Sequence, residues 1–255
     1  MKLTVIGTGN ARLLPVYGCH CMACERARAE PAYSRGKTSA FISYQGRNLL
    51  IDANAEDLLT RFPAGSIDSI VLTHYHMDHV QSLFDLRWGV NLSIPVFGPD
   101  DPVGCDDLFK HPGILVFKPP RQPFEHFYWR DIRITPLPLI HSKPCLGYVF
   151  EGQGKRIAYL TDTVDLPEAV KQWLGQNPVD LMLIDCSFPP VDRAAGEKPL
   201  NHNDVVLAKS IKEECRPTKM GLIHIGHSLE SWAMANPQAF DDDFFLVSDG
   251  QEFNF

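Results

Sequence analysis

Residues 69–79 read SIVLTHYHMDH, an apolar run that passes directly into four potential metal ligands. The apolar run predicts a buried strand, and the carboxyl ends of such strands are where α/β proteins place their sites. His74 and His76 are two residues apart and face the same way in an extended segment, whereas a turn would aim Asp78 and His79 at a second point. This spacing suits two metal ions held close together; a polar surface loop is the competing interpretation.

Apolar runs bounded by Gly and Pro alternate with helical patterns along the chain. We expect strands at residues 2–6, 41–44, 48–52, 69–73, 94–97, 132–139, 146–150, 156–161, 181–185 and 220–225, and helices at 80–88, 167–174 and 204–215. Asn201 or Asn203 is a candidate cap for the last helix. The alternation predicts an α/β protein, and the absence of a linker predicts a single domain over residues 1–255.

The composition excludes several classes of protein. The 255 residues carry 24 Lys and Arg against 31 Asp and Glu, a formal charge of −7, and 44% of them are hydrophobic. The apolar content excludes a disordered chain, and the acidic balance argues against binding a long nucleic acid through bulk charge. The N-terminus shows no signal-peptide pattern, and no apolar run reaches the roughly 18 residues of a membrane helix. We therefore expect a cytoplasmic protein without a membrane partner.

The pattern His-x-His-x-Asp-His at residues 74–79 resembles the signature of the metallo-β-lactamase superfamily. The resemblance implies a four-layer αβ/βα sandwich with a dinuclear metal site between its two sheets. It also implies ligands at later strand ends, where His141, Asp162 and His224 stand in the expected order.

The family pattern divides seven ligands between two metals: His74, His76 and His141 for one, Asp78, His79 and His224 for the other, and Asp162 as the bridge. Asp52 matches an early acidic position of the family and would orient a ligand imidazole or the Asp78 segment. Nitrogen and oxygen ligands suit Zn²⁺ or Mn²⁺ and disfavour metals that select thiolates.

A second cluster of potential ligands, Cys19, Cys21 and Cys24, lies near the N-terminus. Three thiolates predict a structural Zn²⁺, which requires a fourth ligand. His227 is the candidate because it follows a predicted catalytic ligand by three residues, and His20 is the local alternative. Free thiols or a redox pair are the competing interpretation. The other four cysteines are expected to pack as small hydrophobic residues.

Longer stretches make the chain similar to the phosphoribosyl 1,2-cyclic phosphate phosphodiesterases of the carbon–phosphorus lyase pathway of phosphonate degradation. They are residues 18–24, 72–81, 86–90, 104–113, 135–139, 141–143, 185–187 and 201–202, whereas residues 189–199 depart from the family. The resemblance implies that hydroxide attacks the phosphorus of 5-phospho-α-D-ribosyl 1,2-cyclic phosphate and yields ribose 1,5-bisphosphate. It assigns Asp78 and His202 to catalysis and supports a zinc site made of the cysteine triad and His227.

His202 precedes a predicted helix and is the candidate general acid for the departing oxygen. An unperturbed imidazole titrates near neutral pH and can donate a proton there; an exposed loop histidine is the alternative. The second phosphate of the substrate needs a further cation, for which the candidates are Arg35, Lys37, Arg87, Lys110 and Lys143.

Two other functions compete with this one. The first is a tRNA 3′-processing nuclease, which shares the signature but carries a basic arm for tRNA that this sequence does not show. The second is a non-catalytic metal-binding partner of the same superfamily. A small phosphorylated sugar is the expected partner, and a homodimer is implied only by the family.

Overall fold

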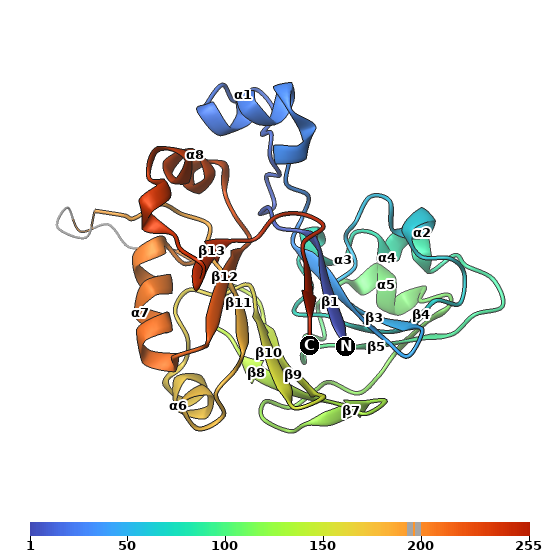
Figure 1. Cartoon of the computed structure of the whole chain (residues 1–255). Helices are drawn as coiled ribbons and strands as arrows, with labels where there is room; N and C mark the ends of the chain where they lie inside the picture. The colour runs from blue at the N-terminus through green and yellow to red at the C-terminus, as the bar shows by residue number, and fades with distance from the viewer. Residues whose placement is uncertain (193–195, 197–199) are drawn as a thin grey trace.

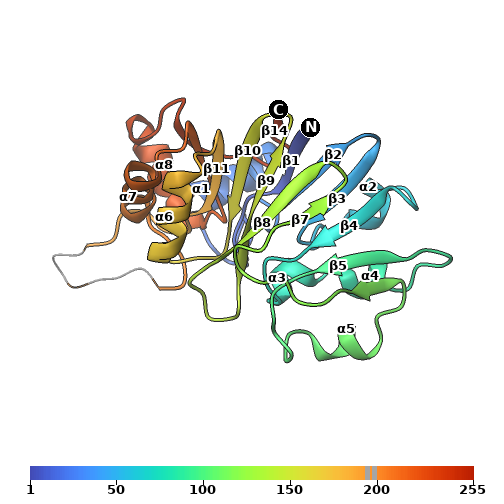
Figure 2. The ribbon, with the colours of Figure 1, turned by 90° about the horizontal axis from the view of Figure 1, so that it is seen from below.

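Two β-sheets face each other at the centre of the molecule, and helices cover their outer sides (Figures 1 and 2). The computed structural model describes residues 1–192, 196 and 200–255, and within them each sheet has seven strands. This arrangement confirms the predicted α/β class and the four-layer αβ/βα sandwich. Residues 193–195 and 197–199, where much of the departure from the phosphodiesterase family falls, lie outside the described residues.

The first sheet has antiparallel strands at one end and parallel strands at the other. Its order is β14 (Glu252–Asn254), β1 (Lys2–Gly7), β2 (Ser39–Tyr44), β3 (Arg47–Ile51), β4 (Ile67–Val71), β5 (Ile94–Phe97) and β6 (Leu115–Phe117). The strands from β3 to β6 are parallel.

The second sheet likewise has parallel strands at one end and antiparallel strands at the other. Its order is β13 (Phe244–Leu246), β12 (Lys219–Ile223), β11 (Leu181–Asp185), β10 (Lys155–Leu160), β9 (Leu146–Gly152), β8 (Ile132–Pro138) and β7 (Phe127–Trp129). The strands from β10 to β13 are parallel, and those from β7 to β10 are antiparallel.

Helices bury the outer face of each sheet (Figure 1). The second sheet is covered by α6 (Glu168–Gln176), α7 (Val205–Cys215) and α8 (His227–Ala235), and the first by α2 (Leu58–Arg61), α3 (Met77–Val80), α4 (Leu83–Leu86) and α5 (Asp106–Lys110). The helix α1 (Met22–Ala29) stands beside α8 at one end of the molecule. None of the helices in the described part of the chain has the length and hydropathy that a membrane crossing requires.

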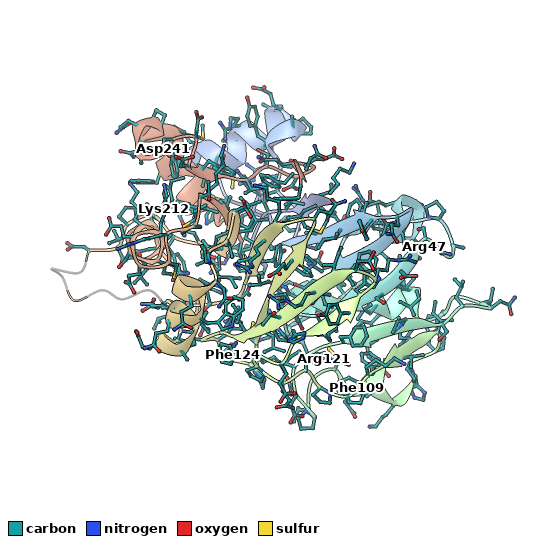
Figure 3. All side chains as sticks on the ribbon, turned by 60° about the horizontal axis from the view of Figure 1, so that its bottom comes forward. Arg47, Phe109, Arg121, Phe124, Lys212 and Asp241 are labelled. Carbon is teal, nitrogen blue, oxygen red and sulfur yellow. The ribbon has the colours of Figure 1, made fainter. Side chains whose placement is uncertain are left out.

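Strand β10 shows why apolar runs form these sheets. Ile157 and Tyr159 pack between the two sheets, whereas Ala158 and Leu160 pack under the helices of the second sheet. Because successive side chains of a strand point to opposite faces, a strand covered on both sides must be apolar throughout. The guanidinium of Arg121 lies 4.6 Å from the ring of Phe97 and 4.7 Å from that of Phe127, and so links β5 to β7. Figure 3 labels Arg121 among the side chains of the molecule.

The parallel halves of the two sheets position the site. The carboxyl ends of β3 and β4 in one sheet, and of β10 and β12 in the other, lead into the predicted site residues. Parallel strands end at a common edge, which is where open α/β sheets bind their ligands. Facing sheets therefore bring two such edges together.

Local expectations were wrong at the end of β4, at the helix of residues 80–88 and at the cap of α7. Strand β4 ends at Val71 rather than at residue 73, because the backbone N–H of Thr73 leaves the ladder and donates to Asp52 Oδ1 over 2.8 Å. The helix expected at residues 80–88 is two short helices, α3 and α4.

The cap of α7 is Asp204, whose carboxylate accepts from the backbone N–H of Leu207 over 2.9 Å. Neither predicted asparagine caps this helix. The amide of Asn203 instead donates to the backbone oxygen of Asp185 over 3.0 Å and accepts from the backbone N–H of Asp165 over 2.7 Å. Asn201 is exposed, with a left-handed backbone at φ 61°.

Candidate functional site

The first group of predicted ligands consists of three imidazoles that converge on one point. His74 and His76 follow β4, and His141 follows β8. His74 Nε2 lies 2.9 Å from His76 Nδ1, which in turn lies 3.1 Å from His141 Nε2. Burial, together with the neighbouring imidazoles, holds the pKa of His74 well below its ordinary value and also lowers the pKa of His76 and of His141. Neutral imidazoles present lone pairs, which is the form that binds a metal.

The second group consists of Asp78, His79, Asp162 and His224, whose potential ligand atoms lie within 4.8 Å of one another. Asp78 and His79 lie on α3, Asp162 follows β10, and His224 follows β12. Burial opposes ionisation of Asp78, but the neighbouring imidazoles of His224 and His79 outweigh it and lower the pKa of Asp78 to about 2. Asp78 is therefore a carboxylate at neutral pH.

One oxygen of Asp162 lies between the two groups. Asp162 Oδ2 is 3.4 Å from His79 Nε2 and 3.4 Å from His224 Nε2. The same atom is 3.8 Å from His74 Nε2 and 3.8 Å from His141 Nε2. The structure thus places Asp162 where a bridging ligand would stand.

The donor atoms of these groups fit a pair of divalent cations. His79 Nε2 and His224 Nε2 are buried without a hydrogen-bond partner among the described residues. Burial would lower the pKa of His79, but the carboxylates of Asp162 and Asp52 outweigh it and raise that pKa well above its ordinary value. A metal cation facing Nε2 would take the place of the proton there and satisfy the buried nitrogen of each imidazole. Imidazole and carboxylate donors suit Zn²⁺ or Mn²⁺.

The buried imidazoles of His79 and His224 each have a partner that sets the orientation of the ring. Asp52 Oδ2 is 2.8 Å from His79 Nδ1, and Ser187 Oγ is 2.9 Å from His224 Nδ1. Such contacts on the far ring nitrogen fix the tautomer and aim the other nitrogen at the metal. Asp52 and His224 adopt left-handed backbone at φ 61° and 59°, a conformation that the surrounding structure must stabilise.

His202 lies beside this site and is held by a residue that the sequence analysis did not single out. Its Nδ1 is 2.7 Å from Asp185 Oδ2, and its ring stacks on His224 with 4.6 Å between centroids. Burial alone would lower the pKa of His202, but the carboxylate of Asp185 outweighs it and raises the pKa to about 9. The imidazole of His202 is therefore protonated at neutral pH, whereas the unperturbed imidazole expected from the sequence would titrate there.

Asp185 lies in the stretch 185–187 that resembles the phosphodiesterase family, and its position at a strand end is a further signal in the sequence. It ends the buried strand β11, in the same way that Asp52 and Asp162 follow strands. Its side chain is fully buried and also accepts from the backbone N–H of Thr163 over 2.9 Å. Asp162, Asp185, His202 and His224 also have potential ligand atoms within 4.8 Å of one another, so His202 is placed either to donate a proton or to bind a metal.

The three cysteines of the N-terminal cluster surround one imidazole nitrogen. His227 Nδ1 is 3.3 Å from the Sγ of Cys19, 3.5 Å from that of Cys21 and 3.8 Å from that of Cys24. Burial opposes the thiolate form of Cys21, but hydrogen bonds outweigh burial and lower the pKa of Cys21 to about 6, and the largest of these contributions comes from Ser231. The alternative ligand His20 is exposed and pairs with Glu25 over 2.6 Å. The four side chains are thus close enough to hold one zinc ion, whose structural sites take four ligands.

The structure pairs the cations proposed for the second phosphate. Arg35 is buried against Glu230 at 2.8 Å, and Arg87 is buried against Asp107 at 2.7 Å. Lys110 pairs with Asp106 at 2.7 Å and Lys143 with Asp101 at 3.3 Å, while Lys37 donates to Gln81. Among these five cations, Lys143 stands two residues after the predicted metal ligand His141.

Comparison with known proteins finds matches over most of the chain. The family model of the beta-lactamase superfamily domain matches residues 47–225. An octanoyltransferase from Porphyromonas gingivalis is 31% identical over 65% of this chain and 35% of its own length. A ribonuclease Z from Clostridium acetobutylicum is 32% identical over 49% of this chain and 47% of its own length. The chain thus spans about a third to a half of the length of these relatives.

A solved structure extends the similarity to the whole chain. A diphosphatase of the PhnP family superposes with a TM-score of 0.81 at 25% identity, over 100% of this chain and 96% of that one.

Proposed function

Since this chain belongs to the β-lactamase superfamily, we propose that it is a metal-dependent phosphodiesterase that hydrolyses 5-phospho-α-D-ribosyl 1,2-cyclic phosphate to ribose 1,5-bisphosphate. The position of Asp162 Oδ2 between two groups of ligand atoms carries the proposal. Such a site suits two cations acting on one phosphate. Similarity to a PhnP-family diphosphatase over the whole chain supports phosphate chemistry.

In this proposal the ligand sets are those of the family pattern. His74, His76 and His141 hold one cation, and Asp78, His79 and His224 hold the other. Asp162 would serve as a ligand to both, and Cys19, Cys21, Cys24 and His227 would hold a structural Zn²⁺. When bound, the two site cations neutralise phosphate charge and lower the pKa of water, whether they are Mn²⁺ or Zn²⁺.

His202 supplies the proton in this reaction. Opening the cyclic phosphate breaks a bond from phosphorus to a sugar oxygen, which must gain a proton as it departs. Asp185 holds His202 through Nδ1 and keeps the imidazole protonated, which leaves Nε2 as the donor. The carboxylate therefore positions the acid and sets its protonation state.

Metal analysis combined with ³¹P NMR tests the proposal. The protein is loaded with Mn²⁺ or Zn²⁺ and given cyclic phosphodiesters with and without a 5-phosphate, and the conversion of cyclic diester to monoester is followed. We expect turnover that requires two metals beyond the zinc of the cysteine cluster. Asp78→Ala should lose metal and activity together, whereas Asp242→Ala, at an exposed position, should retain both. A metal-loaded protein that opens no cyclic diester and no aryl diester would favour a non-catalytic metal-binding partner instead.

A tRNA 3′-processing nuclease is the second candidate, because a ribonuclease Z is 32% identical over 49% of the chain. The charge of −7 disfavours a long polyanion as substrate. Cleavage of a 3′-extended tRNA precursor, with binding that weakens steeply as salt is added, would establish this candidate over the first.

The remaining parts of the proposal concern partners and location. We propose a small phosphorylated sugar as the partner, a homodimer as the assembly and the cytoplasm as the location. Light scattering coupled to size exclusion tests the assembly by the mass of the metal-loaded protein.

A further inference from the structure

A cavity of about 250 Å³ adjoins the metal-ligand groups at His202 and His224. Its other walls come from the loop after β1, including Asn10 and Arg12, and from Gly226 and Ser228 at the start of α8. The cavity therefore extends from the predicted reaction centre toward a segment that the sequence analysis did not assign to substrate.

The β1 loop is anchored on the chain that carries His224. Asn10 donates its backbone N–H to the oxygen of Ile225 over 3.2 Å, and the backbone N–H of Ile225 donates to Thr8 over 2.7 Å. These bonds hold the loop beside the site, with Asn10 Oδ1 accepting from the backbone N–H of Arg12 over 3.1 Å. Arg12 is thus attached to a backbone that is fixed relative to the metal ligands.

Arg12 is the one Lys or Arg among the described residues that line this cavity, and no Asp or Glu lines it. Its side chain is exposed, and no ion pair or side-chain hydrogen bond joins it to the described residues. By contrast, four of the five cations considered from sequence pair with a carboxylate, and the fifth donates to Gln81. Arg12 is therefore free to pair with an anion from solution.

The start of α8 adds to the positive character of the same cavity. Its N-cap residue is Gly226, which offers no side chain to the first backbone N–H groups. A Cβ there would lie 2.5 Å from the backbone oxygen of Ser187, so glycine permits this close packing. The N-terminal end of a helix favours anions, although here it only supplements the guanidinium.

We propose that Arg12 binds the second, non-reacting phosphate of the substrate and is a specificity-determining residue. This rests on the proposed function, because a phosphate that reacts beside His202 and His224 would allow the rest of the sugar phosphate to enter the adjoining cavity. A guanidinium pairs with two phosphate oxygens at once, which gives strong and geometrically selective binding. The enzyme would thus prefer cyclic phosphodiesters that carry a distal phosphate over those that do not.

Kinetics of Arg12→Ala and Arg12→Lys test this assignment. With a ribosyl 1,2-cyclic phosphate bearing a 5-phosphate, Arg12→Ala should raise KM by about tenfold or more, and Arg12→Lys should raise it less. With the same sugar lacking the 5-phosphate, and with bis(p-nitrophenyl) phosphate, both variants should match the parent enzyme. Lys209→Ala removes an exposed positive charge from α7 and is the control, which should leave KM unchanged for every one of these substrates.

Binding of ribose 5-phosphate to the metal-loaded protein gives a second readout, which does not need turnover. We expect Arg12→Ala to raise its Kd by about tenfold, with unchanged metal content and melting temperature. Equal Kd values for the parent and Arg12→Ala would overturn the assignment even in an active enzyme. Conversely, a tenfold difference in Kd without hydrolysis of any diester would retain the anion site and reject the proposed phosphodiesterase.

Discussion

At the residue scale, the pair His202 and Asp185 decides how the site can work. The imidazole and the carboxylate are 2.7 Å apart, and the carboxylate is fully buried. A buried carboxylate stabilises a neighbouring cation strongly because little water screens the interaction. The same two residues also lie near Asp162 and His224, so the role of His202 must be separated from metal binding by experiment.

His202→Ala should lower kcat by about 10²- to 10⁴-fold and leave the metal content unchanged, because a positioned general acid contributes that much. The measurement is kcat with a cyclic diester, alongside metal analysis of the same sample. His126→Ala, at an exposed position, is the control and should retain full activity. If His202→Ala loses a metal, His202 is a ligand and not the acid.

Asp185→Asn should move the alkaline limb of the pH profile of kcat to lower pH. A general acid must be protonated, so activity falls as the pH rises through the pKa of His202, which Asp185 raises to about 9. Removing the carboxylate charge leaves burial as the dominant influence, and burial lowers that pKa. A limb at the same pH in the parent and the variant would show that another group titrates there.

At the element scale, ion pairs as well as backbone hydrogen bonds hold together the antiparallel strands of the second sheet. Glu151 on β9 lies opposite Arg133 on β8 and opposite Arg156 on β10. Its Oε2 is 2.7 Å from Arg133 Nη2 and 2.5 Å from Arg156 Nε. Cross-strand pairs of opposite charge stabilise a sheet and favour one register.

Glu151→Gln should lower the free energy of unfolding by about 1 kcal/mol at pH 7, since two partly exposed pairs are lost. The hydrogen bond from Arg156, with that from Arg133, lowers the pKa of Glu151. Its contribution is therefore present above the unfolded pKa of about 4.3 and is lost as the pH falls through the lower folded value. Urea unfolding at pH 7 and pH 3 should show the difference shrinking at the acidic pH, with Glu213→Gln as an exposed control. An equal loss at both pH values would point to packing instead of charge.

Helices were harder to predict than strands. The apolar runs of β4, β10 and β11 are evident in the sequence because both faces of each strand are covered. By contrast, α1 has three arginine or glutamate residues among its eight, and it buries Ala23, Cys24 and Ala27 against a small cluster. Its position depends on the cysteines and on contacts with α8, including a bond from the backbone N–H of Ala23 to Ser231 Oγ over 3.3 Å.

At the scale of the whole molecule, the cysteine cluster links the two ends of the chain. Cys21 precedes α1, and His227 is the first residue of α8, three residues after His224. Arg26 on α1 also pairs with Glu230 on α8 at 2.5 Å. A zinc ion held here would join α1 to the segment that carries a ligand of the predicted dinuclear site.

Cys21→Ala should remove about one zinc per chain and lower the free energy of unfolding by more than about 2 kcal/mol, because metal binding contributes directly to folding. The two predicted site metals should still be loaded, since their ligands are separate. Metal analysis and thermal unfolding check both points, and Cys105→Ala is the control that should keep its zinc. An unchanged zinc content in Cys21→Ala would contradict the zinc site and favour the competing interpretation of free thiols or a redox pair.

The sequence by itself determined the fold class and which residues belong near the site. The run at residues 69–79 predicted the metal site, since apolar strands and ligand spacing are local properties of the chain, and the resemblance to the metallo-β-lactamase superfamily added His141, Asp162 and His224 at later strand ends. Only the tertiary structure decided the contacts between residues that come from strand ends far apart in the sequence. It placed Asp162 Oδ2 between the two groups, Asp185 against His202 and Arg12 on a cavity beside His224. The physical reason is that burial and neighbouring charge, which set protonation and pairing, exist only once the two sheets face each other.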